Sequence, residues 1–162
     1  MLCKFLNIAL KLTVLATISY AGTIRVVNRV DNTIDDILTL DKLRGTYVST
    51  IDVSRILAKQ DPFINKDRGK MVLYIGDHRI KISGNSSYLL VDEQVFQMPM
   101  HTIIADNDIF LPAKAFFDIV KRAVLPGITY DSRRMVLDID IKVFTITNVN
   151  ISQKSNGTII RI

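Results

Sequence analysis

Cysteine is almost absent from this chain of 162 residues, because Cys3 is its only one. Cys3 falls in the N-terminal segment that we interpret below as a leader, so the rest of the chain contains no thiol. A disulfide, a thiolate nucleophile and a cysteine metal site are therefore excluded for residues 22–162.

Histidine is scarce as well, and the two histidines, His78 and His101, lie far apart in the sequence. A catalytic zinc ion needs three protein ligands and a shell of supporting side chains. Asp106 and Asp108 flank Asn107 as in part of a calcium loop, but the rest of that pattern is missing, so a hairpin turn is the better interpretation. We predict no catalytic residue, no metal site and no cofactor in this sequence.

The excess of positive charge is small. The formal net charge is +5, and removing Lys4 and Lys11 with the leader leaves 5 − 2 = +3. Such an excess is ordinary for a soluble domain, and attraction to an anionic cell-wall polymer is the alternative interpretation. No run of Lys and Arg with interleaved aromatic residues occurs, so nucleic acid is not an expected partner. Nucleophile-elbow, phosphate-loop and Rossmann patterns are absent too.

The N-terminal segment has the pattern of a secretory signal peptide. Residues 1–7 carry Lys4, residues 8–18 are mostly apolar, and Ser19 and Ala21 place small residues three and one before a cut ahead of Gly22. An uncleaved anchor or an N-terminal helix is the alternative. The apolar run is interrupted by a lysine and falls short of the about 20 residues that span a bilayer. We therefore predict cleavage after residue 21, export, and no stable membrane span afterwards.

Two stretches of the chain resemble each other in the same order. Tyr47–Ser49 precedes an amphipathic segment and then Asp67, and Phe110–Pro112 precedes another and then Asp131; each Asp is followed by a Met-Val-Leu-x-Ile strand pattern. The offset from Tyr47 to Phe110 is 63 residues and that from Asp67 to Asp131 is 64. A nearly constant offset predicts a duplicated strand–helix–strand unit.

Both amphipathic segments have helix-start signals. Ser49 and Asp52 have the spacing of a capping box, and Asp61-Pro62 ends the first helix. Pro112 suits the first turn of the second helix, and Lys121 and Arg122 suit its last turn. The apolar positions at helical spacing are Val53, Ile56 and Leu57 in the first segment and Ala115, Phe116, Ile119, Val120 and Ala123 in the second.

Short strands separated by turn residues fill the rest of the chain. Hairpin turns are predicted at Gly76-Asp77, Asp92-Glu93 and 106–108, and a further strand pair is joined through Asp131-Ser132. Pro99 predicts that the strand before it lies at a sheet edge or ends there. The predicted fold class is α+β, with a twisted antiparallel sheet of short strands and two helices against one of its faces.

The C-terminal stretch differs from the rest. Residues 141–149 are rich in β-branched residues, residues 153–157 form a polar turn, and residues 158–162 have a strand pattern up to the last residue. Two interpretations remain open: a truncated chain, or a complete one whose last strand pairs inside the sheet.

The order of these motifs resembles the copper amine oxidase N-terminal-like domain. The residues that carry the resemblance are Gly45–Ser49, Met71–Ile75, Asp92-Glu93, Ile109–Pro112, Tyr130-Asp131 and Met135–Ile139. Val91–Glu93 replaces the family's Val-Asn-Gly hairpin, and Tyr130 replaces its tryptophan. The resemblance implies one domain over residues 22–141, with a sheet curled about a helix, in a secreted bacterial protein. It implies no copper, because copper amine oxidases place their metal chemistry in a separate domain.

Residues 142–162 resemble the first strands of the amidase-localising (AMIN) domain found ahead of N-acetylmuramoyl-L-alanine amidases. This resemblance implies that the chain is the front of a cell-wall amidase, with a zinc hydrolase domain beyond Ile162. The sequence itself favours no enzyme within these residues. Three hypotheses stand: a non-catalytic module of the periplasm or cell wall that helps target a peptidoglycan-acting enzyme, an N-terminal amidase fragment, and a structural domain for protein–protein contacts.

Aromatic residues supply the one binding signal. Exposed tyrosines with a nearby Arg or Lys suit the stacking of sugar rings. Tyr74 alternates with apolar Leu73 and Ile75 and is therefore expected to face solvent, and Arg79 and Tyr88 are further candidates. We predict Tyr74, Arg79 and Tyr88 as binding residues, and peptidoglycan or another cell-envelope polymer as the partner.

Overall fold

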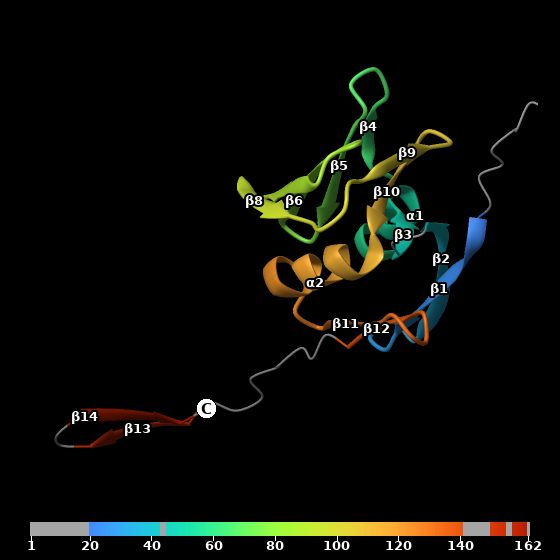
Figure 1. Cartoon of the computed structure of the whole chain (residues 1–162). Coiled ribbons are helices and arrows are strands. Elements are labelled where there is room, and N and C mark those ends of the chain that lie inside the picture. Colours follow the sequence, from blue (N-terminus) through green and yellow to red (C-terminus); the bar gives the residue numbers. More distant parts are fainter. Residues whose placement is uncertain (1–19, 43–44, 141–149, 155–156, 162) are drawn as a thin grey trace, which may run out of the picture.

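The computed structural model describes residues 20–42, 45–140, 150–154 and 157–161 (Figure 1). Residues 1–19 of the predicted leader lie outside this part, and residues 20 and 21 begin the first strand. The predicted signal peptide therefore stays a prediction. In the described part, no helix has the length and apolarity needed to cross a membrane.

A mixed sheet of seven strands forms one layer, in the order β11-β12-β1-β2-β3-β10-β9. Its strands are β1 (Tyr20–Asn28), β2 (Thr33–Lys42), β3 (Gly45–Ser49), β9 (Ile103–Ala105), β10 (Asp108–Pro112), β11 (Ile128–Asp131) and β12 (Val136–Ile139). All neighbours are antiparallel except β1 and β12, which run parallel. The expectation of a purely antiparallel sheet was wrong here, because the crossover that returns the chain beside β1 is long-range and leaves no local pattern.

A second, antiparallel sheet has five strands in sequence order. They are β4 (Phe63–Asn65), β5 (Lys70–Ile75), β6 (His78–Ser83), β7 (Tyr88–Val91) and β8 (Gln94–Gln97). The predicted hairpins at Gly76-Asp77 and Asp92-Glu93 are confirmed. Gly76, Asp92 and Glu93 all have positive φ, as tight hairpin turns require. β4 was not expected from the sequence.

Two helical segments follow β3 and β10. The first is α1 (Thr50–Val53) continued by the π-helix η1 (Ser54–Ala58), and the second is α2 (Ala113–Ala123). Ser49 caps α1 as predicted, since its Oγ accepts from the Asp52 N–H at 3.1 Å. The Asp52 carboxylate accepts from the Leu38 N–H in β2 at 3.0 Å, which ties the helix to the large sheet. Pro112 is the N-cap residue of α2 and thus precedes the first turn in which it was expected.

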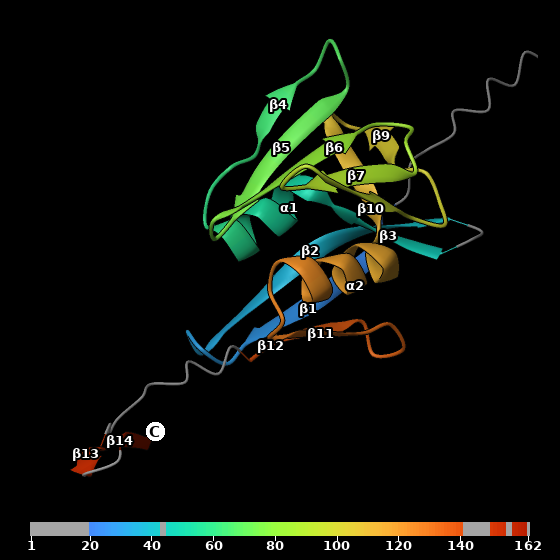
Figure 2. The same cartoon turned by 90° about the vertical axis from the view of Figure 1, so that its left-hand side faces the viewer.

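The helices lie between the two sheets (Figure 2). One cluster of buried apolar side chains includes Ile24 and Leu137 from the large sheet, Leu73 from the small sheet, and Val53 and Phe116 from the helices. The α+β class is therefore confirmed, but the expectation of one sheet with helices on one face was wrong. Alternation along a strand shows that one face is buried, and it does not show which other strands share that layer.

The two resembling stretches are neighbours in the large sheet. β3 and β10 are antiparallel neighbours, with Val48 opposite Leu111, Ser49 opposite Phe110 and Tyr47 opposite Pro112. The two stretches are therefore related by a local twofold axis through the Val48–Leu111 pair. The hairpins after the helices differ, because β4–β5 belongs to the small sheet and β11–β12 to the large one. The fold does not establish a duplicated unit, which stays a prediction.

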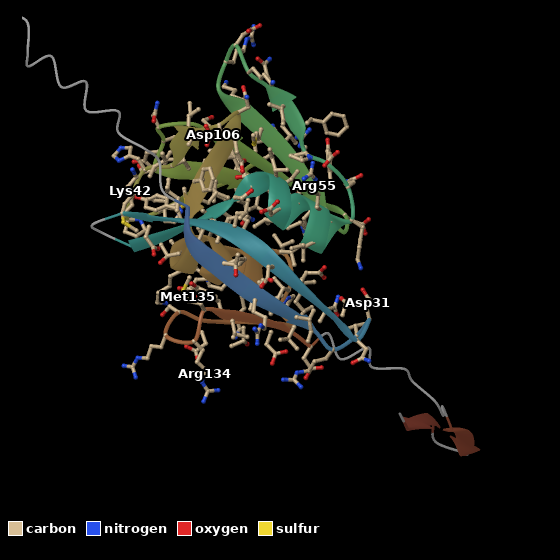
Figure 3. The ribbon with its side chains drawn as sticks, turned by 90° about the vertical axis from the view of Figure 1, so that its right-hand side faces the viewer. Asp31, Lys42, Arg55, Asp106, Arg134 and Met135 are labelled. Atoms are coloured by element: carbon tan, nitrogen blue, oxygen red, sulfur yellow. The ribbon has the colours of Figure 1, made fainter. Side chains whose placement is uncertain are left out.

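The loop between β11 and β12 corrects one predicted boundary. Met135 was expected to begin the last strand, but it lies in the loop with φ 54°, beside Arg134 (Figure 3). The Asp131 carboxylate accepts from the N–H groups of Arg133 and Arg134, at 2.9 and 3.1 Å. This side-chain turn occupies the first loop residues and delays the strand to Val136.

The C-terminal stretch is described only in part. β13 (Asn150–Lys154) and β14 (Gly157–Arg161) pair as an antiparallel hairpin, which agrees with the strand predicted near the end of the chain. Residues 141–149 lie outside the described part, so the predicted domain boundary after residue 141 and the AMIN-like segment at 142–162 stay predictions.

Gly84 allows the loop after β6 to approach the Ile104 side chain of β9 closely, and we expect Gly84→Ala to destabilise the fold. A Cβ at Gly84 would lie 2.3 Å from Cδ1 and 2.4 Å from Cγ1 of Ile104. Ile104 is 48% exposed and its side chain can move partly aside, so we expect a cost of about 1 kcal/mol in the free energy of unfolding, at the low end for overpacking. Urea unfolding of Gly84→Ala, Ile104→Ala and the double variant tests this. The cost of Gly84→Ala should fall sharply in the Ile104→Ala background, and an undiminished cost would refute the steric explanation.

Candidate binding face

The outer face of the small sheet is the strongest candidate site, and we call it the outer face. It is the side of the small sheet turned away from the helices (Figure 2), and the less buried alternate residues of the strands belong to it. Met71, Leu73 and Ile75 of β5 point inward and are buried, so Val72 and Tyr74 point outward. The strand register then aligns one row of outer-face residues across all five strands: Phe63, Val72, Lys81, Leu90 and Val95.

All three predicted binding residues lie on the outer face. Tyr74 is directly opposite Arg79 on the neighbouring strand, and Tyr88 lies on β7 with half of its surface exposed, at 50%. The register puts Lys81 on the diagonal between the two tyrosines. With about 4.8 Å between strands and about 3.4 Å per residue, the tyrosine Cα atoms are roughly 16 Å apart. The two rings therefore cannot contact one small ligand, but both can contact an elongated one.

An aromatic pair occupies one end of this diagonal. The rings of Phe63 and Tyr74 meet edge to face, with centroids 6.1 Å apart and an interplanar angle of 84°. Phe63 is 68% exposed. The sequence pattern did not indicate Phe63 as a binding residue, because it did not predict the strand β4. The available signal in the sequence was an aromatic residue directly after Asp61-Pro62.

One carboxylate, that of Glu93, forms ion pairs with two cations of the outer face. Glu93 forms ion pairs with Arg79 and with Lys81, the latter at 3.0 Å. Hydrogen bonding and attraction from Lys81, followed by those from Arg79, lower the pKa of Glu93 below its usual value. Two cations thus share one anion, and Lys70 on the same face is exposed. The outer face therefore combines aromatic rings with a net positive charge.

His78 and Asp92 form a second polar pair at the end of the small sheet. The His78 Nδ1 and Asp92 Oδ2 atoms are 2.5 Å apart. The Arg79 N–H, which donates to Asp92 Oδ1 at 2.7 Å, is the main cause of a lowered pKa for Asp92, and His78 adds to it. The Asp92 carboxylate binds the His78 ring and the Arg79 backbone N–H, whereas the Glu93 carboxylate binds the Arg79 and Lys81 side chains, so the two carboxylates do not act on one point. Within the described residues, no group of three His, Cys, Asp or Glu side chains could hold a metal ion.

Asp108 is a buried carboxylate, although the sequence predicts a turn at residues 106–108. The turn residues are Asp106 and Asn107, both with positive φ, and Asp106 lies at the hairpin (Figure 3). Asp108 belongs to β10, is 6% exposed, and bonds the Ser49 Oγ at 2.5 Å and the Ile51 N–H at 3.3 Å. Burial raises its pKa, and these hydrogen bonds oppose the rise. Its partners form the start of α1, so we assign it a structural role.

Two cavities beside α2 are also lined by residues of β8, and we call them together the β8–α2 trough. A cavity of about 590 Å³ near the start of α2 and one of about 370 Å³ near its end share Arg122 in their walls. Gln97 lines the larger cavity, and Gln94 and Phe96 line the smaller one. The sequence indicated only that the strand before Pro99 is an edge or ends there, and β8 is an edge strand that ends at Gln97.

Comparisons with known proteins add no relative. No protein-family model, no curated protein and no solved structure matches this chain. The resemblances to the copper amine oxidase N-terminal-like domain and to the AMIN domain therefore stay predictions, and function is argued from the residues alone.

Proposed function

We propose that this protein is an exported, non-catalytic module of the cell envelope that binds peptidoglycan or a related polymer through the outer face. The observation that carries the proposal is the diagonal from Tyr74 through Lys81 to Tyr88 on one exposed sheet face. Aromatic rings suit the apolar faces of sugars, and cations suit acidic groups along a polymer. The leader pattern supports export, and the outer face offers no catalytic constellation.

The spacing of the rings favours a polymer over a single sugar. Tyr74 and Tyr88 are roughly 16 Å apart by strand geometry, so each would contact a different ring of an extended glycan. Both tyrosines lie on hydrogen-bonded strands of one sheet, so binding needs little reorganisation of the backbone, which limits the entropy lost on binding. In this role the module would hold a peptidoglycan-acting enzyme near its substrate. An N-terminal position in an N-acetylmuramoyl-L-alanine amidase is one form of that arrangement.

Sedimentation with purified murein sacculi tests the proposal. We expect the full chain to enter the pellet at moderate salt, and Tyr74→Ala and Tyr88→Ala each to weaken binding about fivefold, as loss of about 1 kcal/mol implies. Ile34→Ala is the matched control, because Ile34 is 70% exposed but belongs to β2 of the other sheet. No enrichment in the pellet, or equal losses for Ile34→Ala, would contradict the proposal.

A protein-contact role is the second candidate. β8 is an edge strand, and an unpaired sheet edge can add a strand from another chain. This role uses a different surface from the outer face, so the two can coexist.

A further inference from the structure

The edge of β8 offers backbone hydrogen-bonding groups to the β8–α2 trough. The two-residue turn at Asp92-Glu93 makes Val91 and Gln94 a hydrogen-bonded pair, so Gln94 and Phe96 direct their backbone groups toward β7. The Met98 N–H donates to the Ser87 carbonyl at 2.7 Å, so every second residue, Gln94, Phe96 and Met98, directs its backbone groups toward the sheet. The backbone groups of Val95 and Gln97 must therefore point outward, away from the sheet.

The trough also has a positive charge that forms no ion pair within the part of the chain that the structure describes. Lys114 pairs with Asp118 at 2.8 Å, and His78 pairs with Asp92 at 2.5 Å. Arg122 is exposed, and within the described residues it forms no ion pair; its Nε donates only to the Asp118 carbonyl of its own helix, at 3.3 Å. The guanidinium is a planar, permanently charged donor that suits a carboxylate.

The larger cavity supplies an apolar surface beside this charge. Pro99, Met100 and Ile119 contribute to its walls. Successive side chains of an extended peptide point to opposite sides, so a strand added to β8 would direct alternate side chains toward α2. One such side chain can enter the cavity while another reaches Arg122.

We infer that the β8–α2 trough binds an extended segment of another protein, which adds a strand to β8 and places an apolar side chain in the larger cavity and a carboxylate at Arg122. The outward N–H and C=O groups of β8 recur every two residues, which matches the spacing along a polypeptide backbone. A glycan has no groups with that repeat. A second copy of β8 does not satisfy the site, because Gln94–Gln97 contains no acidic residue.

The charge at Arg122 is tested with a set of fluorescein-labelled hexapeptides of alternating Val and Thr, in which one Glu or one Gln occupies each position in turn. Anisotropy titration with the full chain should show at least one Glu peptide that binds about tenfold or more tightly than its Gln counterpart, as a charge-assisted hydrogen bond implies. Arg122→Gln should abolish that preference. Lys121→Gln is the matched control and should preserve it, since Lys121 bonds Thr129 in β11.

Strand addition is tested at Val95. Val95→Pro removes an outward N–H without removing a bond to β7, and proline is tolerated at such edge positions. Val95→Ala retains that N–H and removes the same side chain. We expect Val95→Pro to weaken the best peptide about tenfold or more and Val95→Ala to change its affinity less than about threefold, with unchanged circular dichroism for both.

Three results would overturn the inference. The first is that no peptide binds at concentrations up to about 1 mM. The second is equal binding by the Val95→Pro and Val95→Ala variants. The third is a dimer in sedimentation velocity that Val95→Pro dissociates while no peptide binds, because the edge of β8 would then belong to a second copy. Murein binding through the outer face is measured separately, so each proposal can fail alone.

Discussion

Phe116→Ala should lower the free energy of unfolding by about 3–5 kcal/mol, the largest loss that we expect from a single substitution. Phe116 is fully buried in α2, between the two sheets, and its ring centroid lies 5.5 Å from that of Phe117. Truncation to alanine removes apolar contacts and leaves a cavity that the packed layers can only partly close. Because domains are stable by only about 5–15 kcal/mol, the variant should have much less structure at 37 °C.

Urea unfolding followed by circular dichroism measures this loss, and Phe63→Ala provides the matched control. The same atoms are removed from a residue that is 68% exposed, so the loss should be below about 1 kcal/mol and arise mainly from the ring contact with Tyr74. Phe63→Ala should instead weaken murein binding. If both variants unfold at similar urea concentrations, the assignment of Phe116 to the shared core is wrong.

Asp108→Ala should lower the free energy of unfolding by about 2–3 kcal/mol, the second largest effect. The substitution removes the acceptor for the Ser49 hydroxyl and for the Ile51 N–H, and both lie at the start of α1. Buried donors without a partner carry the cost of their lost hydration. Asp108→Asn is the matched variant. Its amide oxygen can still accept from the N–H groups, and it carries no charge to bury, so its stability at neutral pH should be close to that of the parent.

The pH dependence of the free energy of unfolding, compared between the parent and Asp108→Asn, separates the effect of the charge from that of the hydrogen bonds. Burial raises the folded-state pKa of Asp108 above its ordinary value of 3.8, so the folded state binds the proton more tightly than the unfolded state. The resulting stabilisation is fully present below pH 3.8 and is lost as the pH rises through the raised pKa. The stability of the parent relative to Asp108→Asn should therefore decline as the pH rises above 3.8. A constant difference from pH 3.5 to about pH 7 would contradict a raised pKa.

The hairpins were predictable because their determinants are local. Gly76 and the Asp92-Glu93 pair adopt positive φ in turns of two residues, and the flanking strands alternate between apolar and polar residues. Ser49 begins α1 through a bond to a residue three positions away. Such features depend on a few neighbouring residues, whose preferences the sequence displays directly.

The binding residues were partly predictable for the same reason. Alternation with Leu73 and Ile75 was enough to place Tyr74 on an exposed face. The position of Arg79 opposite Tyr74 depends on strand register, and the contact of Phe63 with Tyr74 depends on β4, which the sequence pattern does not predict.

The sequence by itself determined the α+β class, the order of the hairpins, the two helix starts and the edge position of the strand before Pro99. Only the tertiary structure decided that the strands divide between two sheets, that β1 and β12 run parallel, that Asp108 caps α1 from another element, and that β8 and α2 enclose a trough. The physical reason is that turn and cap conformations follow from adjacent residues. The choice of neighbouring strand and the burial of a carboxylate instead follow from contacts between residues far apart in the chain.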